Sequence, residues 1–301
     1  MMIFFRLLLK RALMLLLPLI MLAATTTPVT AQALRIGLVP EHDIFTQKTL
    51  YKQLFDYLNE QQGFSFELCM LPHHDMLLEA FAGHELDAAL FGSFTGAIAI
   101  QTLDMIPLVR PHFSEGLSSD YGVIFVRRQG GIDGIDDMRD RRIVFVDPLS
   151  ATGYLLPLLS LRDKGMDDYR SWFSQHYFAG SHEDTIYEVL KGHADVGASK
   201  SSIFYKIART NPQILEKLEI LASSAHVPAL TLGVQSHLDR GSVILLLETL
   251  TNMHETPSGR ETLNNMSIQR FITTTRKDFL PVREYAEQLD VNFTDAPYLH
   301  E

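Results

Sequence analysis

The chain is poor in several features that define whole classes of protein. It has a single cysteine, Cys69, so no disulfide can form within it, which excludes the small disulfide-stapled folds. Its 26 lysines and arginines are outnumbered by 36 aspartates and glutamates, which gives a formal net charge of −10. Nucleic acids and anionic membrane surfaces repel so acidic a protein, so we expect no nucleic-acid partner. Any anion that binds must be attracted by local groups.

A long apolar run occurs only near the N-terminus. Basic residues precede an apolar stretch over residues 12–24, and a polar sequence with small residues, TTTPVTAQA, follows it. This run is shorter than the roughly 20 residues of a membrane-spanning helix. We interpret residues 1–31 as a cleaved signal peptide, with cleavage after Ala31 or alternatively Ala33. We therefore expect a periplasmic protein if the organism is a Gram-negative bacterium.

The remaining roughly 270 residues are enough to bury one large core or two medium ones without cross-links. Apolar runs with strand character alternate with segments whose apolar residues recur at helical spacing. The runs that predict strands include LRIGLV, FSFELCML, DAALFG, YGVIFVRR, RIVFVDP, HYFAG and ADVGAS. Roughly the last 70 residues are predicted to be mainly helical. This alternation is typical of parallel sheets covered by helices.

Two such units predict an α/β protein with two lobes. We assign residues 34–121 and 231–301 to lobe 1 and residues 122–230 to lobe 2, with the chain crossing near Tyr121 and Pro228. Ligands of such proteins bind in the crevice at the carboxyl ends of the strands. The loops that follow the predicted strands are therefore the candidate binding loops.

The stretch VDPLSATGYLLP, residues 146–157, joins a predicted buried strand directly to a helix. Ser150 and Thr152 would cap that helix, or they would form an anion site together with its free backbone N–H groups. Gly153 favours the anion site, because glycine permits a close backbone approach that a cap does not require. The residues alone leave both roles open.

The order of motifs along the chain resembles one family, the phosphate/phosphite/phosphonate-binding proteins of ABC importers. The matching motifs are RIGLVPEHD, ELDAALFGSFTGAIA, YGVIFVRR, RIVFVDPLSATGYLLP, AGSHEDTIYEVLKGHADVGAS and DFLPVREYAEQL, between Leu34 and Leu289. The resemblance implies the type II periplasmic-binding-protein fold, with two mixed, mainly parallel sheets and a cleft between the lobes. It also implies that a small phosphate-, phosphite- or phosphonate-like oxyanion is captured there for an ABC importer.

The same resemblance implies a set of binding residues in lobe 2. Ser150, Thr152 and Gly153 would hold the oxyanion, while Ala151 stands where many relatives carry another hydroxyl. His182 in GSHED would donate to the anion, and an anionic partner would raise the pKa of its imidazole. Lys200 would add a positive charge to the cleft, which favours a more anionic ligand over an aminophosphonate.

In lobe 1 the sequence departs from the family pattern. Relatives commonly carry Phe-Gly-Pro-x-Ser-Tyr where this chain has Phe-Gly-Ser-Phe-Thr-Gly, so Ser93 replaces the proline and Gly96 replaces the tyrosine. The pocket would then be wider there, or another side chain would fill it. Ser93 and Thr95 are placed to cap the next helix and to face the ligand, and Glu41 with His42 would lie at the mouth of the cleft.

Other constellations have simpler structural explanations. His73, His74 and Asp75 suggest a metal site, but neighbouring side chains diverge at a helix start and no further ligand pair accompanies them. Ser150, His182 and Asp195 are the residue types of a hydrolase triad, but no nucleophile-elbow motif surrounds the serine. We therefore expect no metal, no cofactor and no enzymatic activity.

We expect the protein to be a monomer. We also expect it to close around its small anionic ligand, because the ligand contacts both lobes only in the closed state. Its partner would be an ABC permease. The alternative is a membrane-bound sensor or enzyme that recognises the closed form, and the altered loop over residues 91–96 makes this role more plausible than for a typical relative.

Overall fold

The computed structural model describes residues 33–61, 65–113, 118–166, 168–291 and 293. The predicted signal peptide, residues 1–31, lies outside the described residues. Within the described part of the chain, none of the helices combines the length and the apolar character needed to cross a bilayer.

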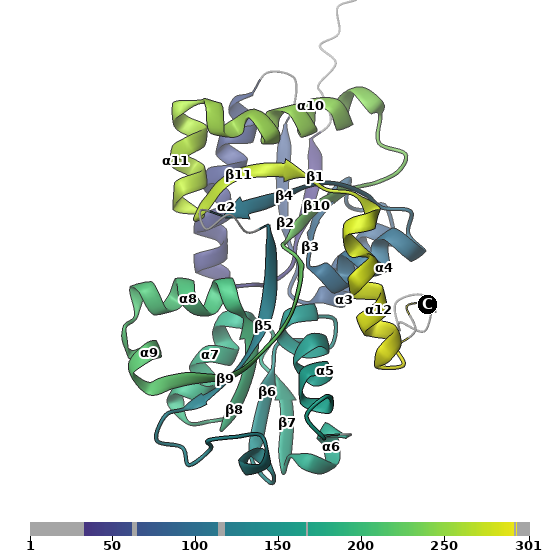
Figure 1. Ribbon diagram of the computed structural model, residues 1–301. Coiled ribbons are helices and arrows are strands. Elements are labelled where there is room, and N and C mark those ends of the chain that lie inside the picture. Colours follow the sequence, from purple (N-terminus) through teal and green to yellow (C-terminus); the bar gives the residue numbers. More distant parts are fainter. Residues whose placement is uncertain (1–32, 62–64, 114–117, 167, 292, 294–301) are drawn as a thin grey trace, which may run out of the picture. The chain divides into compact units, whose positions relative to one another are not determined.

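Two separate mixed sheets form the framework (Figure 1). The first sheet has the order β11 (Ile268–Thr273), β4 (Ile106–Phe113), β10 (Thr231–Val234), β3 (Ala88–Phe91), β1 (Leu34–Leu38) and β2 (Phe66–Met70). Strand β1 runs parallel to β2 and β3, whereas β10 pairs antiparallel with β3 and β4, and β11 pairs antiparallel with β4. The parallel part therefore lies around β1, where the predicted strand–helix alternation begins.

The second sheet has the order β7 (Gln175–Phe178), β6 (Arg142–Phe145), β8 (Val196–Lys200), β5 (Ser119–Arg127) and β9 (Leu218–Pro228). Strand β6 is parallel to β7 and β8, and β5 is antiparallel to β8 and β9. The chain enters this sheet between β4 and β5 and leaves it between β9 and β10. The predicted α/β class with two mixed sheets is confirmed. Among the described strand pairs four are parallel and five are antiparallel, so the sheets are less parallel than predicted.

Helices cover both faces of each sheet (Figure 1). Those packed with the first sheet are α2 (Ile44–Glu60), α3 (His74–Ala82), α4 (Ser93–Thr102), α10 (Arg240–Asn252), α11 (Pro257–Asn265) and α12 (Leu280–Gln288). Those packed with the second are α5 (Leu156–Arg162), α6 (Tyr169–Trp172), α7 (His182–Lys191), α8 (Ser201–Thr210) and α9 (Gln213–Lys217). Short 3₁₀ turns cover Asp136–Met138, Met253–Glu255 and Arg276–Phe279.

Strand β3 illustrates why the predicted strands are continuous apolar runs. Ala88 and Leu90 belong to the apolar cluster on one face of the first sheet, whereas Ala89 and Phe91 belong to the cluster on the opposite face. Side chains alternate across a strand, so a strand with helices on both faces needs apolar residues at every position. Burial on both faces also fixes the strand ends, which carry the candidate binding loops.

Two segments differ from the sequence-based expectation. Residues 268–273 form the edge strand β11, within the region predicted to be mainly helical, and a register shift between Ile268 and Arg270 interrupts its pairing with β4. The predicted helix after the VDPLSATG motif starts with a π-helical turn over Ala151–Leu155 before α5 begins. Both departures are local irregularities of the backbone that a regular apolar period does not reveal.

Candidate functional site

Four buried basic side chains lie at helix N-termini in the loops where the two sheets meet. His42 precedes the N-cap of α2, His74 and His182 are the first residues of α3 and α7, and Lys200 is the N-cap of α8. Their exposed fractions are 5%, 3%, 3% and 8%, respectively. We call these four residues the basic cluster. The helix dipole disfavours a cation at each of these positions, so a member that carries a charge needs a negatively charged partner.

Carboxylates from the opposite sheet provide a partner for three members of the basic cluster. The pairs are Lys200 with Glu41, His42 with Glu183 at 3.0 Å between Nδ1 and Oε2, and His74 with Asp147 at 3.4 Å between Nδ1 and Oδ2. Each pair joins a loop of the first sheet to a loop of the second. These contacts therefore tie the two halves of the molecule together at the predicted binding loops.

The loop that carries Glu41 and His42 is held by the buried amide of Gln47. Its Oε1 accepts from the backbone N–H groups of Glu41 and His42 at 2.7 and 3.2 Å, and its Nε2 donates to the carbonyl of Val39 at 3.0 Å. Asp43 caps α2 by accepting from the N–H groups of its first turn. Gln47 has no obvious signal in the sequence, because its role depends on the path of the preceding loop.

His182 differs from the other members of the basic cluster because it has no carboxylate partner among the described residues. Its Nδ1 accepts a 3.0 Å hydrogen bond from the backbone N–H of Lys200, and the Ser199 hydroxyl donates to the carbonyl of His182 at 3.1 Å. Burial, followed by the nearby His74 and His42, lowers the pKa of His182 to about 3. The imidazole is therefore neutral, with its proton on Nε2, where it can donate to an anion.

The pKa values of Lys200 and Asp147 also differ from their ordinary values. Burial lowers the pKa of Lys200 to about 7. The adjacent Glu41 carboxylate opposes that shift, because it stabilises the ammonium. Burial raises the pKa of Asp147, but the interaction with His74 and a hydrogen bond from the N–H of Leu149 outweigh it and leave that pKa below its usual value. Because Lys200 already has an anionic partner, its charge is compensated within the protein.

The VDPLSATG motif forms a capped turn in the structure. The Ser150 Oγ accepts from the backbone N–H of Gly153 at 3.0 Å, so Ser150 is an N-cap. Ala151 and Thr152 are buried beside it. A Cβ on Gly153 would clash with Cγ2 of Val146, the residue that follows β6, so the close approach that requires this glycine is to the end of that strand.

The predicted residues of the first sheet are also buried and hydrogen-bonded. The Ser93 hydroxyl donates to the carbonyl of Pro228 at 2.6 Å, which joins α4 to the end of β9. The Thr95 hydroxyl donates to the carbonyl of Gly92 at 3.2 Å. A Cβ on Gly96 would lie 2.8 Å from Cε1 of Phe279, so the Phe279 ring fills the space beside the glycine that replaces the family tyrosine.

A cavity of about 720 Å³ lies between α2 and β11 of the first sheet and α8 of the second. Glu41 and Lys200 line it, together with His42. The other predicted binding residues, Ser150, Ala151, Thr152, Gly153, His182, Ser93 and Thr95, do not line this cavity. We call the boundary between the loops of the two sheets, where the basic cluster and its carboxylate partners lie, the seam. The predicted residues all lie at this seam, but some of them line the cavity and the others are buried away from it.

Sequence reasoning missed three charged or polar residues of this seam. The sequence suggests only a metal site for His74 and places Asp147 in a motif without a role, and it gives no signal for Glu183. His74 lies four residues after the end of β2, so the rule that ligands meet the carboxyl ends of parallel strands points to it. Among the described residues, no group of three or more histidine, cysteine or acidic side chains is arranged to hold a metal ion.

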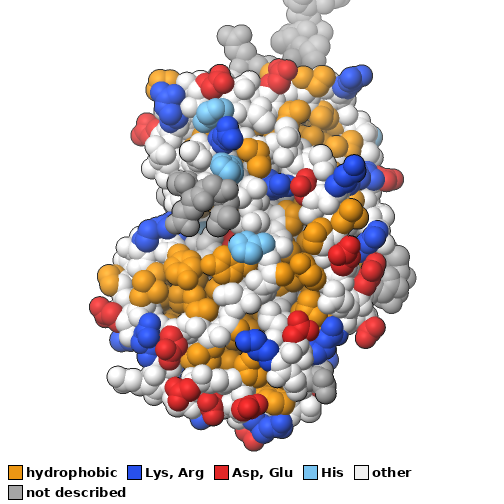
Figure 2. Space-filling model, viewed as in Figure 1, with side chains coloured by type: hydrophobic (Ala, Val, Ile, Leu, Met, Phe, Trp, Pro, Cys, Tyr) orange, Lys and Arg blue, Asp and Glu red, His pale blue; other side chains and the backbone are white. Residues whose placement is uncertain are grey.

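The face shown in Figure 2 has no extended positive patch. On the face shown in Figure 2, lysines and arginines are interspersed with aspartates and glutamates, and hydrophobic side chains gather over α8 and β9. An anion is therefore attracted by groups within the seam and not by an extended positive surface on this face.

Comparison with known proteins identifies the family. The family model described as "ABC transporter, phosphonate, periplasmic substrate-binding protein" matches residues 36–279. The phosphate-import protein PhnD of Mycolicibacterium smegmatis is 25% identical over 183 residues, which cover 58% of this chain and 57% of that protein. A probable ABC transporter phosphite-binding protein, PhnD1 of Prochlorococcus marinus, is 21% identical over 273 residues, which cover 86% of this chain and 90% of the relative.

Solved structures show the same fold. A binding-protein component of an ABC phosphonate transporter from Pseudomonas aeruginosa superposes with a TM-score of 0.79 at 17% identity, covering 84% of this chain and 85% of the other. PhnD1 from Prochlorococcus marinus in complex with methylphosphonate gives a TM-score of 0.77 at 19% identity, covering 86% and 98%. Since the family match extends from β1 to the turn before α12, the chain belongs to the periplasmic substrate-binding proteins of phosphonate ABC transporters.

Proposed function

We propose that this protein captures a small phosphorus oxyanion, such as a phosphonate, phosphite or phosphate, between its two lobes and delivers it to an ABC permease. The lobes would be residues 34–121 with 231–301, and residues 122–230. We further propose that residues 1–31 direct export and are then removed, and that the mature chain acts as a monomer. No bond is made or broken in this function.

The observation that carries the proposal is the convergence of the basic cluster with helix N-termini at one seam. Basic side chains are buried at four helix N-termini, and the chain supplies three carboxylates from the opposite sheet as their partners. An oxyanion would interact with the same groups, because it accepts charge-assisted hydrogen bonds from imidazole, ammonium and backbone N–H donors. Ligand binding would then replace some protein carboxylates as the link between the lobes.

His182 would be the principal neutral donor. Its Nε2–H is fixed by the hydrogen bond that Nδ1 accepts from Lys200. Ser150, Thr152 and the backbone around Gly153 would add hydroxyl and amide donors, with Ser93, Thr95 and Glu41 on the other side of the seam. Ala151 would contribute through its backbone. Neutral donors suit a doubly charged oxyanion because they hold it without burying a full set of counter-charges.

A thermal-shift and calorimetric screen of the mature protein tests this function. The probes are methylphosphonate, phosphite, phosphate and, as the oxyanion without phosphorus, sulfate. A ligand at 100 times its dissociation constant stabilises the folded state by about 2.7 kcal/mol. We expect such a stabilisation with at least one phosphorus oxyanion and none with sulfate. The proposal fails if no phosphorus oxyanion shifts the melting temperature while an uncharged or cationic solute does.

Delivery to a permease has a separate test. An ABC permease and ATPase of the same organism would be reconstituted in vesicles, and ATP hydrolysis measured with the loaded protein. We expect stimulation that requires both the binding protein and its oxyanion. Stimulation that is independent of the ligand would contradict a role in ligand delivery.

Light scattering of the mature chain at working concentration tests whether it is a monomer.

A further inference from the structure

The cavity beside the basic cluster is much larger than an inorganic oxyanion needs. Its volume of about 720 Å³ lies within the range of roughly 300–1,000 Å³ that is typical of sites for organic ligands. The wall formed by the first sheet is mainly apolar, with Leu50 and Leu54 from α2 and Ile268 and Phe271 from β11, and polar groups of Tyr51, Asn264 and Ser267 also border the cavity. The apolar part of this wall is suited to hydrocarbon groups.

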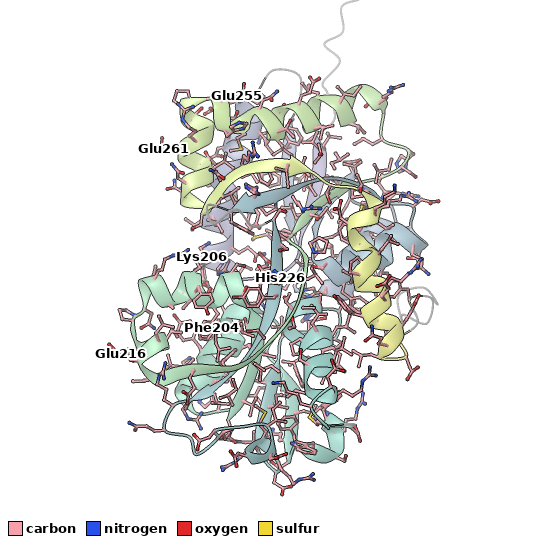
Figure 3. The ribbon with its side chains drawn as sticks, viewed as in Figure 1. Phe204, Lys206, Glu216, His226, Glu255 and Glu261 are labelled. Atoms are coloured by element: carbon pink, nitrogen blue, oxygen red, sulfur yellow. The ribbon has the colours of Figure 1, made fainter. Side chains whose placement is uncertain are left out.

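The opposite wall is cationic. Lys206 and Arg209 project from α8 to this cavity, and Figure 3 shows Lys206 on the side of α8 that faces α2. Within the described part of the chain, neither side chain forms an ion pair with a carboxylate. Burial, followed by the neighbouring Arg209, lowers the pKa of Lys206, and Glu183 opposes this shift. A ligand amine placed here would be repelled by the positive charges of Lys206 and Arg209.

The acidic groups of the cavity are already occupied by the protein. Asp120 accepts from the Ser201 hydroxyl at 2.6 Å, from the N–H of Tyr121 at 3.0 Å, from the N–H of Ser202 at 3.2 Å and from the Ser202 hydroxyl. Glu41 pairs with Lys200. Three of these donors bond to Oδ1 and the Ser202 hydroxyl bonds to Oδ2, so Asp120 is a structural anchor for the start of α8 and its acceptor capacity is used mainly within the protein.

We propose that this cavity binds the organic substituent of the oxyanion ligand and selects an apolar substituent that carries no positive charge. The inference rests on the proposed function, because it assumes that the oxyanion itself binds at the basic cluster. The two regions are continuous: Glu41, His42 and Lys200 belong to the seam and also line the cavity. The preferred ligand is then an aryl- or alkylphosphonate.

Calorimetric titration of the mature protein with three matched probes tests the proposal. The probes are methylphosphonate, phenylphosphonate and 2-aminoethylphosphonate, which share the acid and differ in the substituent. We expect phenylphosphonate to bind at least about tenfold more tightly than methylphosphonate, equivalent to about 1.4 kcal/mol, and 2-aminoethylphosphonate to bind more weakly than both. Phenylphosphonate binding no tighter than methylphosphonate would overturn the inference.

Two variants test the contributions of the apolar wall and the cationic wall separately. Leu50→Trp places a larger side chain at the apolar wall, and we expect it to remove the advantage of phenylphosphonate while methylphosphonate binding stays within twofold. Leu247→Trp is the matched control, because Leu247 is a half-buried helical leucine packed against the same apolar cluster outside the cavity. Lys206→Glu should improve 2-aminoethylphosphonate binding by about tenfold, and Lys191→Glu on α7 should not.

The outcomes distinguish the two proposals. If none of the three phosphonates nor phosphite or phosphate binds, the proposed function fails. If methylphosphonate binds but the affinity order does not follow the substituent, or if Leu50→Trp leaves the order unchanged, only the inference about the cavity fails. Circular dichroism of each variant shows whether a loss of binding comes from loss of the fold.

Discussion

The Nδ1 atom of His182 accepts a 3.0 Å hydrogen bond from the backbone N–H of Lys200, so the end of β8 fixes the tautomer of a buried imidazole. A protonated Nδ1 could not accept this bond, and burial reinforces the neutral state. The donor that His182 offers is therefore Nε2–H at every pH near neutrality. The end of strand β8 in the second sheet thus determines which nitrogen of His182 carries the proton.

The first prediction concerns the pH dependence of stability. The pKa of His182 is lowered to about 3 in the folded state, below the unfolded value near 6.5. The unfolded chain therefore binds more protons between these values, and the contribution of His182 to stability is complete above about pH 6.5 and is lost as the pH falls toward 3. His182→Gln should reduce the slope of unfolding free energy against pH by up to about 1.4 kcal/mol per pH unit.

Urea denaturation between pH 7.5 and 4.5 measures this slope. His193→Gln is the matched control, because His193 lies on the surface with its side chain 61% exposed. An unchanged slope in His182→Gln would show that other groups dominate the acid dependence.

The second prediction concerns the buried pair of Lys200 and Glu41. Either single variant, Glu41→Gln or Lys200→Met, leaves one buried charge without its partner and should lower the free energy of unfolding by about 3 kcal/mol or more. The double variant should lose clearly less than the sum of the two. A double-mutant cycle by urea denaturation at pH 7 measures the coupling.

The exposed pair of Lys52 and Asp56 is the control for this cycle, since its side chains are 66% and 56% exposed. Its coupling should be below about 1 kcal/mol, because solvent screens an exposed pair. Equal couplings for the buried and exposed pairs would contradict the structural role assigned to Lys200 and Glu41.

The third prediction separates capping from anion binding in the VDPLSATG motif. Ser150→Ala removes an N-cap and should cost about 1 kcal/mol of stability. Combined with Thr152→Ala, it should abolish oxyanion binding while the circular dichroism spectrum is retained. Titration with methylphosphonate provides the measurement.

Thr256→Ala is a close control for that experiment. Thr256 caps α11 by accepting from the N–H of Gly259 at 3.0 Å, which matches the distance between Ser150 and Gly153. It should cost a similar free energy of unfolding and leave the affinity unchanged. Full affinity in the Ser150 and Thr152 double variant would leave the motif with a capping role alone.

The fourth prediction concerns the glycine that replaces the family tyrosine. Gly96→Ala would place a Cβ 2.8 Å from the Phe279 ring, and the overpacking should lower the free energy of unfolding by about 1–3 kcal/mol. In a Phe279→Leu background the same substitution should cost less, because the ring atom is gone. Chemical denaturation of the four proteins measures this. Additive effects would mean that Phe279 does not limit the space at Gly96.

Local patterns account for the elements that the sequence predicted well. Strand β3 is recognisable because a short run buried on both faces is apolar at every position, and α4 begins at Ser93 after the single residue Gly92. Strand β11 was not recognisable, because the register shift near Ile268 breaks its two-residue alternation and its partner β4 is distant in the chain. The π-helical turn at Ala151 likewise has no periodic signature.

The sequence by itself determined the α/β class, the two-sheet arrangement and the candidate loops, because strand ends and helix starts are encoded by neighbouring residues. Only the tertiary structure decided how the charges in those loops are used. The contacts of Lys200 with Glu41 and of His42 with Glu183 join residues that are far apart in the chain, and burial determines the ionisation of His182. Long-range pairing and desolvation depend on the packed fold, and no local pattern in the sequence encodes them.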